Sequence, residues 1–140
     1  MVAYYGQVLI LARRLIRLFA QVLDLPPNVL RPHVQDSGRR VQNSALPPAM
    51  AELSNLDIGA HTDIEYSTIL CQGTQPELQV LNSDGEWLSA LPIPGTFVVN
   101  IGDMLSYWSN DNFVSTVYRV LNITGEERYS KPFFRGPNYE

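Results

Sequence analysis

The stretch from Leu56 to Gln72 reads LDIGAHTDIEYSTILCQ and contains two short extended runs, 56–61 and 67–72, on either side of a polar segment. Runs of the same length and character recur further along the chain, separated by Gly, Pro, Asn and Asp. Short strands at such spacing, with no long helical pattern among them, predict a β-sandwich or jelly-roll barrel whose interior holds a ligand cavity. The later runs are 78–82, 97–101, 116–121 and 128–134.

The residues before this β region predict one amphipathic helix. Apolar side chains recur at spacings of four, three and four within residues 2–23, and Pro26-Pro27 end the pattern. Charged side chains interrupt the run, which therefore fits neither a signal peptide nor a membrane span. We expect the helix to pack against the outer face of the sheet, with a dimer interface as the alternative, and its arginines to lie in solvent. The expected apolar stripe is Leu11, Leu15, Leu18 and Val22, and the arginines are Arg13, Arg14 and Arg17.

Length and composition indicate one compact domain. The chain has 140 residues, 45% of them apolar and 17% charged, which is enough to build a hydrophobic core. We divide it into an N-terminal helix and turn (1–30), a connecting loop (31–55) with one short strand near 40–44, and a β core (56–140).

The net charge of −4 argues against a nucleic-acid partner, and the single cysteine excludes an intrachain disulfide. We expect an intracellular, cytoplasmic protein with no membrane association.

His61 and Asp63 are the first candidate site residues. They stand two positions apart on an extended segment, so we expect their side chains to point to the same face and to reach one ion. An imidazole and a carboxylate are two of the three protein ligands of a non-haem Fe(II) oxygenase site, which needs one more imidazole. The only other histidine is His33, in the Arg31-Pro32-His33 loop, which is a candidate for that ligand.

A series of motifs runs through the second half of the chain in a fixed order. They are GAHTD (59–63), LQV (78–80), DGEW (84–87), PIPGTFVVNIGD (92–103), ST (115–116), YRV (118–120), ERYS (127–130) and PFF (132–134). In these motifs the chain resembles the Fe(II)/2-oxoglutarate-dependent dioxygenases of the isopenicillin N synthase-like type. The resemblance implies a mainly β fold with an N-terminal α-helix and a double-stranded β-helix core of the jelly-roll or cupin-like kind.

The resemblance also implies roles for individual residues. His61 and Asp63 match the first two iron ligands of the family. Arg128 and Ser130 match the Arg-x-Ser pair that binds the far carboxylate of 2-oxoglutarate. The distal histidine ligand falls on Tyr118, and a phenol, with an ordinary pKa of about 10, must lose its proton to bind a metal well. We therefore expect an incomplete metal site and no cofactor, or Fe(II) and 2-oxoglutarate if the family activity survives.

A second departure affects the cosubstrate site. Where the family usually has Tyr-Pro-Pro, this chain has Leu46 before two prolines, and a leucine cannot donate a hydrogen bond. The guanidinium of Arg128, with Ser130 on the same strand face, still suits a carboxylate. We expect a pocket-facing anion site for 2-oxoglutarate or another carboxylate. The alternative is an ion pair between Arg128 and a neighbouring acid, Glu126 or Glu127.

Three hypotheses of function are open at this point. In the first, the pocket has lost its redox chemistry and catalyses a metal-independent cyclisation, isomerisation or dehydration of a small natural-product intermediate, since the resembling family often acts in secondary metabolism. Proton transfer and polarisation then come from His61, Asp63, Tyr118 and Arg128. The second hypothesis is a working Fe(II)/2-oxoglutarate oxygenase with Tyr118 or a water as third ligand. The third is a non-catalytic binding or regulatory protein.

A protein partner is a further expectation. Full-length family members are longer than this chain, so surfaces that their extra elements cover are expected to be bare here. Bare strand edges and apolar faces favour association, and we expect a homodimer first and another partner protein second.

Overall fold

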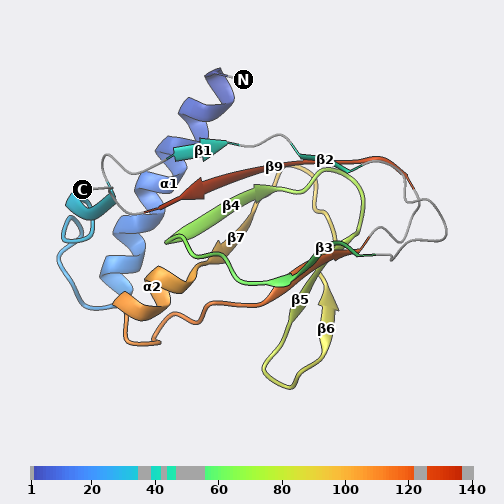
Figure 1. The fold of residues 1–140 in the computed structure, drawn as a ribbon. Coiled ribbons are helices and arrows are strands. Elements are labelled where there is room, and N and C mark those ends of the chain that lie inside the picture. Colours follow the sequence, from blue (N-terminus) through green and yellow to red (C-terminus); the bar gives the residue numbers. More distant parts are fainter. Residues whose placement is uncertain (1, 35–38, 42–43, 47–55, 122–125, 137–140) are drawn as a thin grey trace.

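A computed structural model describes residues 2–34, 39–41, 44–46, 56–121 and 126–136, which form an N-terminal helix and two β-sheets (Figure 1). Two turn signals of the sequence, Asp36-Ser37-Gly38 and Pro47-Pro48, lie outside the described residues. In chain order the elements are α1 (Val2–Val22), the 3-10 helix η1 (Pro32–Val34), β1 (Arg39–Val41), β2 (Ser44–Leu46), β3 (Leu56–His61), β4 (Ser67–Cys71), β5 (Leu78–Leu81), β6 (Trp87–Ser89), β7 (Val98–Ile101), α2 (Asp103–Trp108), β8 (Tyr118–Leu121) and β9 (Arg128–Arg135).

Every pairing between the described strands is antiparallel. One sheet has the strand order β1-β9-β4-β7, with β2 also paired to β9, and the other has the order β3-β8-β5-β6. From β3 onward the chain passes repeatedly from one sheet to the other, which is the winding of a double-stranded β-helix. The predicted mainly β fold with an N-terminal helix and a double-stranded β-helix core is thus confirmed.

α1 covers the outer face of the five-stranded sheet (Figure 1). Val8 and Ala12 pack with Ile69 of β4 and Phe133 of β9, which are paired across the two strands. This is the expected location of the helix, but the predicted apolar stripe is wrong in part. Small side chains at two buried positions let the helix approach the sheet, so the leucines beside them pack only at the edge of the contact. The buried positions are Val8, Ala12, Ile16 and Ala20, whereas Leu18 and Val22 are exposed.

The short elements differ most from the sequence expectations. α2 and β6 are not predicted, because elements of six and three residues are too short to show a recognisable period. Two three-residue strands, β1 and β2, replace the single strand expected near 40–44, and both pair with β9. The sequence Asn82-Ser83-Asp84-Gly85 predicts a hairpin turn, because Asp-Gly favours positive φ. The turn is present, and Asn82 Oδ1 accepts hydrogen bonds from the backbone N–H groups of Asp84 and Glu86. Within the described residues, none of the helices has the length and hydrophobicity that a bilayer crossing needs.

Tyr66 is fully buried in a second hydrophobic cluster with Ile16, Val34 and Leu105. Burial raises the pKa of its hydroxyl above the ordinary value of 10, and the charge of Arg135 opposes this only in part. A raised folded-state pKa stabilises the fold below the unfolded-state pKa, and this contribution is lost as the pH rises above it. We therefore expect the melting temperature to fall above pH 10, and to fall less in Tyr66→Phe. Melts on both sides of that pH test this, and identical profiles for both proteins would contradict it.

Candidate functional site

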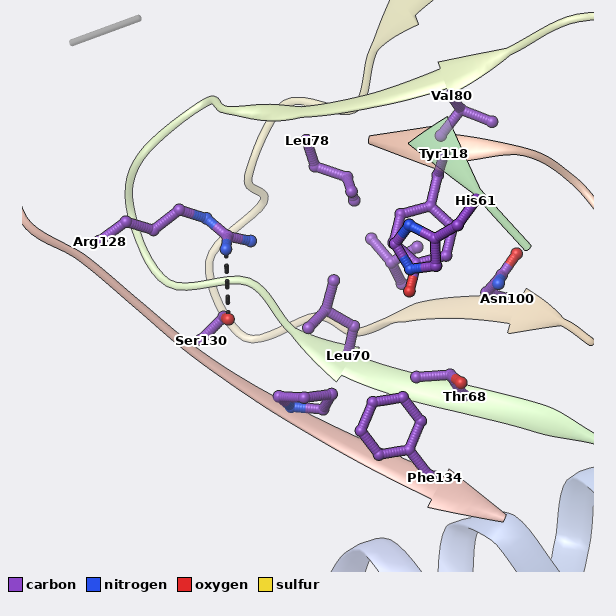
Figure 2. Close-up of a pocket in the computed structure, with 12 residues that line it drawn as sticks. His61, Thr68, Leu70, Leu78, Val80, Asn100, Tyr118, Arg128, Ser130 and Phe134 are labelled. Carbon is purple, nitrogen blue, oxygen red and sulfur yellow. Dashed lines mark hydrogen bonds between the residues drawn. The ribbon is translucent and has the colours of Figure 1, made fainter. Parts of the chain in front are cut away.

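A cavity of about 140 Å³ lies between the two sheets (Figure 2). Its lining comes from alternate positions of the strands, because successive side chains of a strand point to opposite faces. His61 and Tyr118 stand at one end, and Arg128 and Ser130 stand at the other (Figure 2). The apolar walls between these ends are formed by Leu70, Leu78, Val80, Val98, Pro132 and Phe134.

Asp63 is buried next to His61, with 6% of its surface exposed. The Tyr118 hydroxyl donates a hydrogen bond to its Oδ1 atom at 3.0 Å. Thr68 and Asn100 donate to Oδ2 at 2.5 and 3.1 Å. A buried carboxylate is costly unless it has such partners. Three neutral protein donors therefore stabilise the carboxylate at the position where the resemblance places an iron ligand.

The imidazole of His61 is oriented through its Nδ1 atom. Nδ1 lies 2.7 Å from the carbonyl oxygen of Gly59, and since a carbonyl oxygen only accepts hydrogen bonds, Nδ1 carries the proton. The ring of Tyr118, which is paired with His61 across β3 and β8, contacts the imidazole with centroids 4.4 Å apart. Nε2 lies 4.0 Å from Asp63 Oδ1, too far for a hydrogen bond. In the neutral ring, Nε2 is thus the nitrogen with a lone pair.

A loop, and not a shared strand, brings Asp63 to His61. The expectation that both residues lie on one extended segment is wrong, because β3 ends at His61 and Asp63 follows in the loop. This loop is held against the start of α2, where the backbone N–H of Asp103 donates to the carbonyl oxygen of Asp63 at 2.7 Å. The approach requires glycine at position 102, since a Cβ atom on Gly102 would lie 1.8 Å from the carbonyl oxygen of Glu65.

Tyr118 keeps its phenol proton in this environment. Burial raises the pKa of its hydroxyl most, Asp63 raises it further through its charge and its hydrogen bond, and Arg128 opposes these effects. A phenol that holds its proton is a poor metal ligand. In the part of the chain that the structure describes, no group of three or more His, Cys, Asp or Glu side chains is placed to hold a metal ion. The donor set at this position therefore does not fit the Fe(II) that the family implies.

The other end of the cavity holds Arg128, whose guanidinium points inward from β9 (Figure 2). Its Nη1 atom donates a hydrogen bond to Ser130 Oγ at 3.2 Å, and only 2% of Arg128 is exposed. Its Nε atom lies 3.7 Å from Oε2 of Glu77, which directly precedes β5 and is completely buried. The sequence offers Glu126 or Glu127 as the ion-pair partner of Arg128, but the structure pairs Arg128 with Glu77. The arginine and serine of the cosubstrate pattern are present, but the arginine faces a buried acid.

Two other residues from the sequence analysis do not join the site. His33 belongs to η1, and its ring contacts that of Trp108 in α2 with centroids 6.0 Å apart. It is not among the described residues that line the cavity, so the structure does not bring it to His61. Leu46 is the last residue of β2 and pairs with Arg128 in backbone register, while its side chain lies outside the described part of the chain.

Residues 36–137 match the family model described as the 2OG-Fe(II) oxygenase superfamily. The chain belongs to this superfamily. It is 44% identical over 144 residues to a 2-oxoglutarate-Fe(II) type oxidoreductase, ppzC, of Metarhizium rileyi, in a match that covers 96% of this chain and 38% of the relative. It is 34% identical to gibberellin 2-beta-dioxygenase 4 of Arabidopsis thaliana, with 96% of this chain and 46% of the relative covered.

Solved structures of the superfamily share the fold. A full-length Neurospora crassa protein in complex with alpha-KG and 5-formyluracil superimposes with a TM-score of 0.91 at 30% identity, over 99% of this chain and 48% of that chain. JOX2 in complex with 2OG, Fe and JA superimposes with a TM-score of 0.89 at 29% identity, over 97% of this chain and 41% of that chain. The chain thus spans less than half the length of these relatives.

Sequence reasoning misses three residues of the site, namely Thr68, Asn100 and Glu77. Thr68 and Asn100 occupy the inward-pointing positions of β4 and β7, so the period of two along each run is a signal that finds them. Glu77 carries no such signal. It precedes its strand, and its pairing with Arg128 depends on how the two sheets close on each other.

Proposed function

We propose that this chain uses an iron-free pocket to catalyse a metal-independent proton transfer, as in an isomerisation, cyclisation or dehydration, on a small and largely apolar organic molecule. The carboxylate at the iron position supports this, because it accepts three hydrogen bonds from the protein, one of them from Tyr118. These donors stabilise the carboxylate of Asp63 without a cation. The three protein donors alone therefore satisfy the carboxylate of Asp63 when no metal ion is bound.

His61 is the proposed base. Its Nδ1–H group is directed to the Gly59 carbonyl, so Nε2 presents its lone pair at the cavity. In the proposed step, Nε2 takes a proton from a carbon next to a carbonyl group of the substrate, and the C–H electron pair moves into the forming enolate. The imidazolium then returns the proton to another atom of the substrate. The substrate is neither oxidised nor reduced, so the step needs no oxidant.

Asp63 and Tyr118 are positioning residues in this proposal. The Tyr118 ring contacts the imidazole of His61, and its hydroxyl is committed to the carboxylate of Asp63. That carboxylate lies 4.0 Å from Nε2, a separation at which it stabilises the imidazolium that forms. Of the four residues to which the first hypothesis gives proton transfer and polarisation, we therefore propose that His61 alone exchanges a proton with the substrate.

The cavity sets the size and polarity of the proposed substrate. Its volume is about 140 Å³, and an engineered cavity of about 150 Å³ holds one benzene molecule. Leu70, Leu78 and Phe134 are among its apolar walls. We therefore propose a substrate with a body about the size of one ring and a polar group that reaches Arg128.

Three measurements on EDTA-treated protein test the proposal. Anaerobic calorimetry with Fe(II) is expected to show no stoichiometric binding, and 2-oxoglutarate is expected not to be converted to succinate. 5-Nitrobenzisoxazole then serves as a probe for a base at the mouth of the cavity, where 38% of the His61 side chain is exposed. Removal of its ring C–H proton breaks the N–O bond and releases a coloured phenolate. We expect this ring opening to be insensitive to EDTA and to slow at least about 100-fold in His61→Ala.

His33→Ala is the matched control, since it removes the other histidine of the chain and His33 is not part of the described cavity lining. Its rate is expected to equal that of the wild type. Equal rates in His61→Ala and wild type would contradict the proposed base. Iron-dependent formation of succinate would contradict the iron-free pocket.

The relatives favour a second candidate function, an Fe(II)- and 2-oxoglutarate-dependent oxidation. The Metarhizium rileyi protein carries this chemistry in its name. In this candidate Tyr118 or a water takes the third ligand position, and ligation by Tyr118 requires its hydrogen bond to Asp63 to break. The iron titration separates the two functions, because only the second gives stoichiometric Fe(II) binding and turnover of 2-oxoglutarate.

A further inference from the structure

Glu77 is a buried acid beside Arg128, which lines one end of the cavity. Its side chain is completely buried, and its carboxylate lies 3.7 Å from Nε of Arg128, of which 2% is exposed. Backbone hydrogen bonds hold Glu77 in place, because its N–H donates to the carbonyl oxygen of Gln75 and its own carbonyl accepts from the N–H of Leu121. The acid is thus fixed at the residue before β5, opposite the arginine that it faces.

The two buried groups compensate each other's charge. A buried ion is costly unless an opposite charge lies close to it. Arg128 in β9 and Glu77, just before β5 of the other sheet, lie at this distance. The Arg-x-Ser pattern of the family binds a ligand carboxylate. Here a ligand carboxylate would also lie near the carboxylate of Glu77, and like charges in buried surroundings repel each other strongly.

We propose that Glu77 makes the Arg128 end of the cavity selective for an uncharged hydrogen-bond acceptor, such as a ketone, ester or amide oxygen, and selective against a carboxylate. This inference rests on the proposed iron-free pocket and specifies its substrate class. The guanidinium points into the cavity, and the Ser130 hydroxyl, which accepts from Nη1, carries a proton of its own to donate (Figure 2). An uncharged ligand oxygen can accept hydrogen bonds from both the Arg128 guanidinium and the Ser130 hydroxyl without adding a second negative charge beside Glu77.

Calorimetry in EDTA with two probes of the same chain length tests this selectivity. The probes are 2-oxoglutarate and its 5-methyl ester, which lacks the far negative charge. The wild type is expected to bind the ester at least about 10-fold more tightly. Glu77→Gln keeps the shape of the side chain and removes its charge, so we expect the preference to reverse, with a gain of at least about 10-fold for 2-oxoglutarate. Adding Arg128→Gln to Glu77→Gln is expected to abolish that gain.

Glu126→Gln is the matched control. It removes an acid from the exposed surface, where Glu126 accepts a hydrogen bond from Gln75, and is expected to leave the preference unchanged. Melting curves establish that each variant folds, and the two probes on the wild type decide the question even if Glu77→Gln does not fold.

A wild type that binds 2-oxoglutarate more tightly than the ester overturns the inference, as does the absence of binding of either probe to all of these proteins. The outcome is independent of the test of the proposed function, because it is a binding preference measured without iron. The binding preference is expected to remain even if the His61→Ala variant opens the ring of 5-nitrobenzisoxazole as fast as the wild type does.

Discussion

Tyr118→His is expected to produce Fe(II) binding at least about 100-fold tighter than that of the wild type, because even an outer-sphere partner changes metal affinity by 10- to 100-fold and a direct ligand changes it more. Position 118 lies opposite His61 across β3 and β8, and its side chain reaches Asp63. A neutral imidazole binds Fe(II) without first losing a proton. The substitution also frees Asp63 Oδ1 from the hydrogen bond of the phenol. Anaerobic calorimetry measures the gain.

Tyr118→Phe is the control for this prediction. It removes the hydroxyl without supplying a ligand, so Fe(II) binding is expected to stay absent. Asp63 loses one of its donors, and the free energy of unfolding is expected to fall by about 1–3 kcal/mol. A wild type that binds Fe(II) tightly, with the binding lost in Tyr118→Phe, would make Tyr118 a ligand and would refute the iron-free pocket.

Gly102→Ala is expected to lower the free energy of unfolding by about 3 kcal/mol, which corresponds to a fall of roughly 10 °C in melting temperature for a chain of this length. A Cβ atom at this position would lie 1.8 Å from the carbonyl oxygen of Glu65 and 2.9 Å from that of Asp63. These are backbone atoms, so they cannot rotate away as the end of a side chain can. The loop that carries Asp63 must shift, and we expect the proton-transfer rate to fall as well.

Gly6→Ala is expected to change the free energy of unfolding in the opposite direction. Gly6 lies within α1, and a Cβ atom there meets nothing within 4 Å. Replacing a helical glycine by alanine reduces the conformational freedom of the unfolded chain, so we expect a gain of about 0.5–1 kcal/mol. Thermal melts of both variants test the pair, and a Gly102→Ala protein as stable as the wild type would contradict the close packing of the Asp63 loop.

The strands and the helix of this protein are predictable because their signals are local. Extended runs separated by turn residues mark the β core, and the structure places strands in all six of them. The phase of α1 is harder to predict, because Ala12 and Ala20 are small and contribute little to an apolar pattern although both are buried. The face of α1 that packs depends on how closely the helix backbone can approach the sheet. This distance is set by the side chains on the sheet surface, which the helix sequence does not show.

The sequence by itself determined the family, the β core, and the replacement of the distal histidine by Tyr118, because each of these is a matter of residue type and order along the chain. Only the tertiary structure decided the partners of the site residues. Asp63 receives hydrogen bonds from three side chains on three different strands, and Arg128 meets Glu77 from the opposite sheet. Apart from the hydrogen bond from Thr68, which is five residues from Asp63, these contacts join residues far apart in the chain. Their existence depends on how the two sheets close on each other, which spacing along the sequence does not encode.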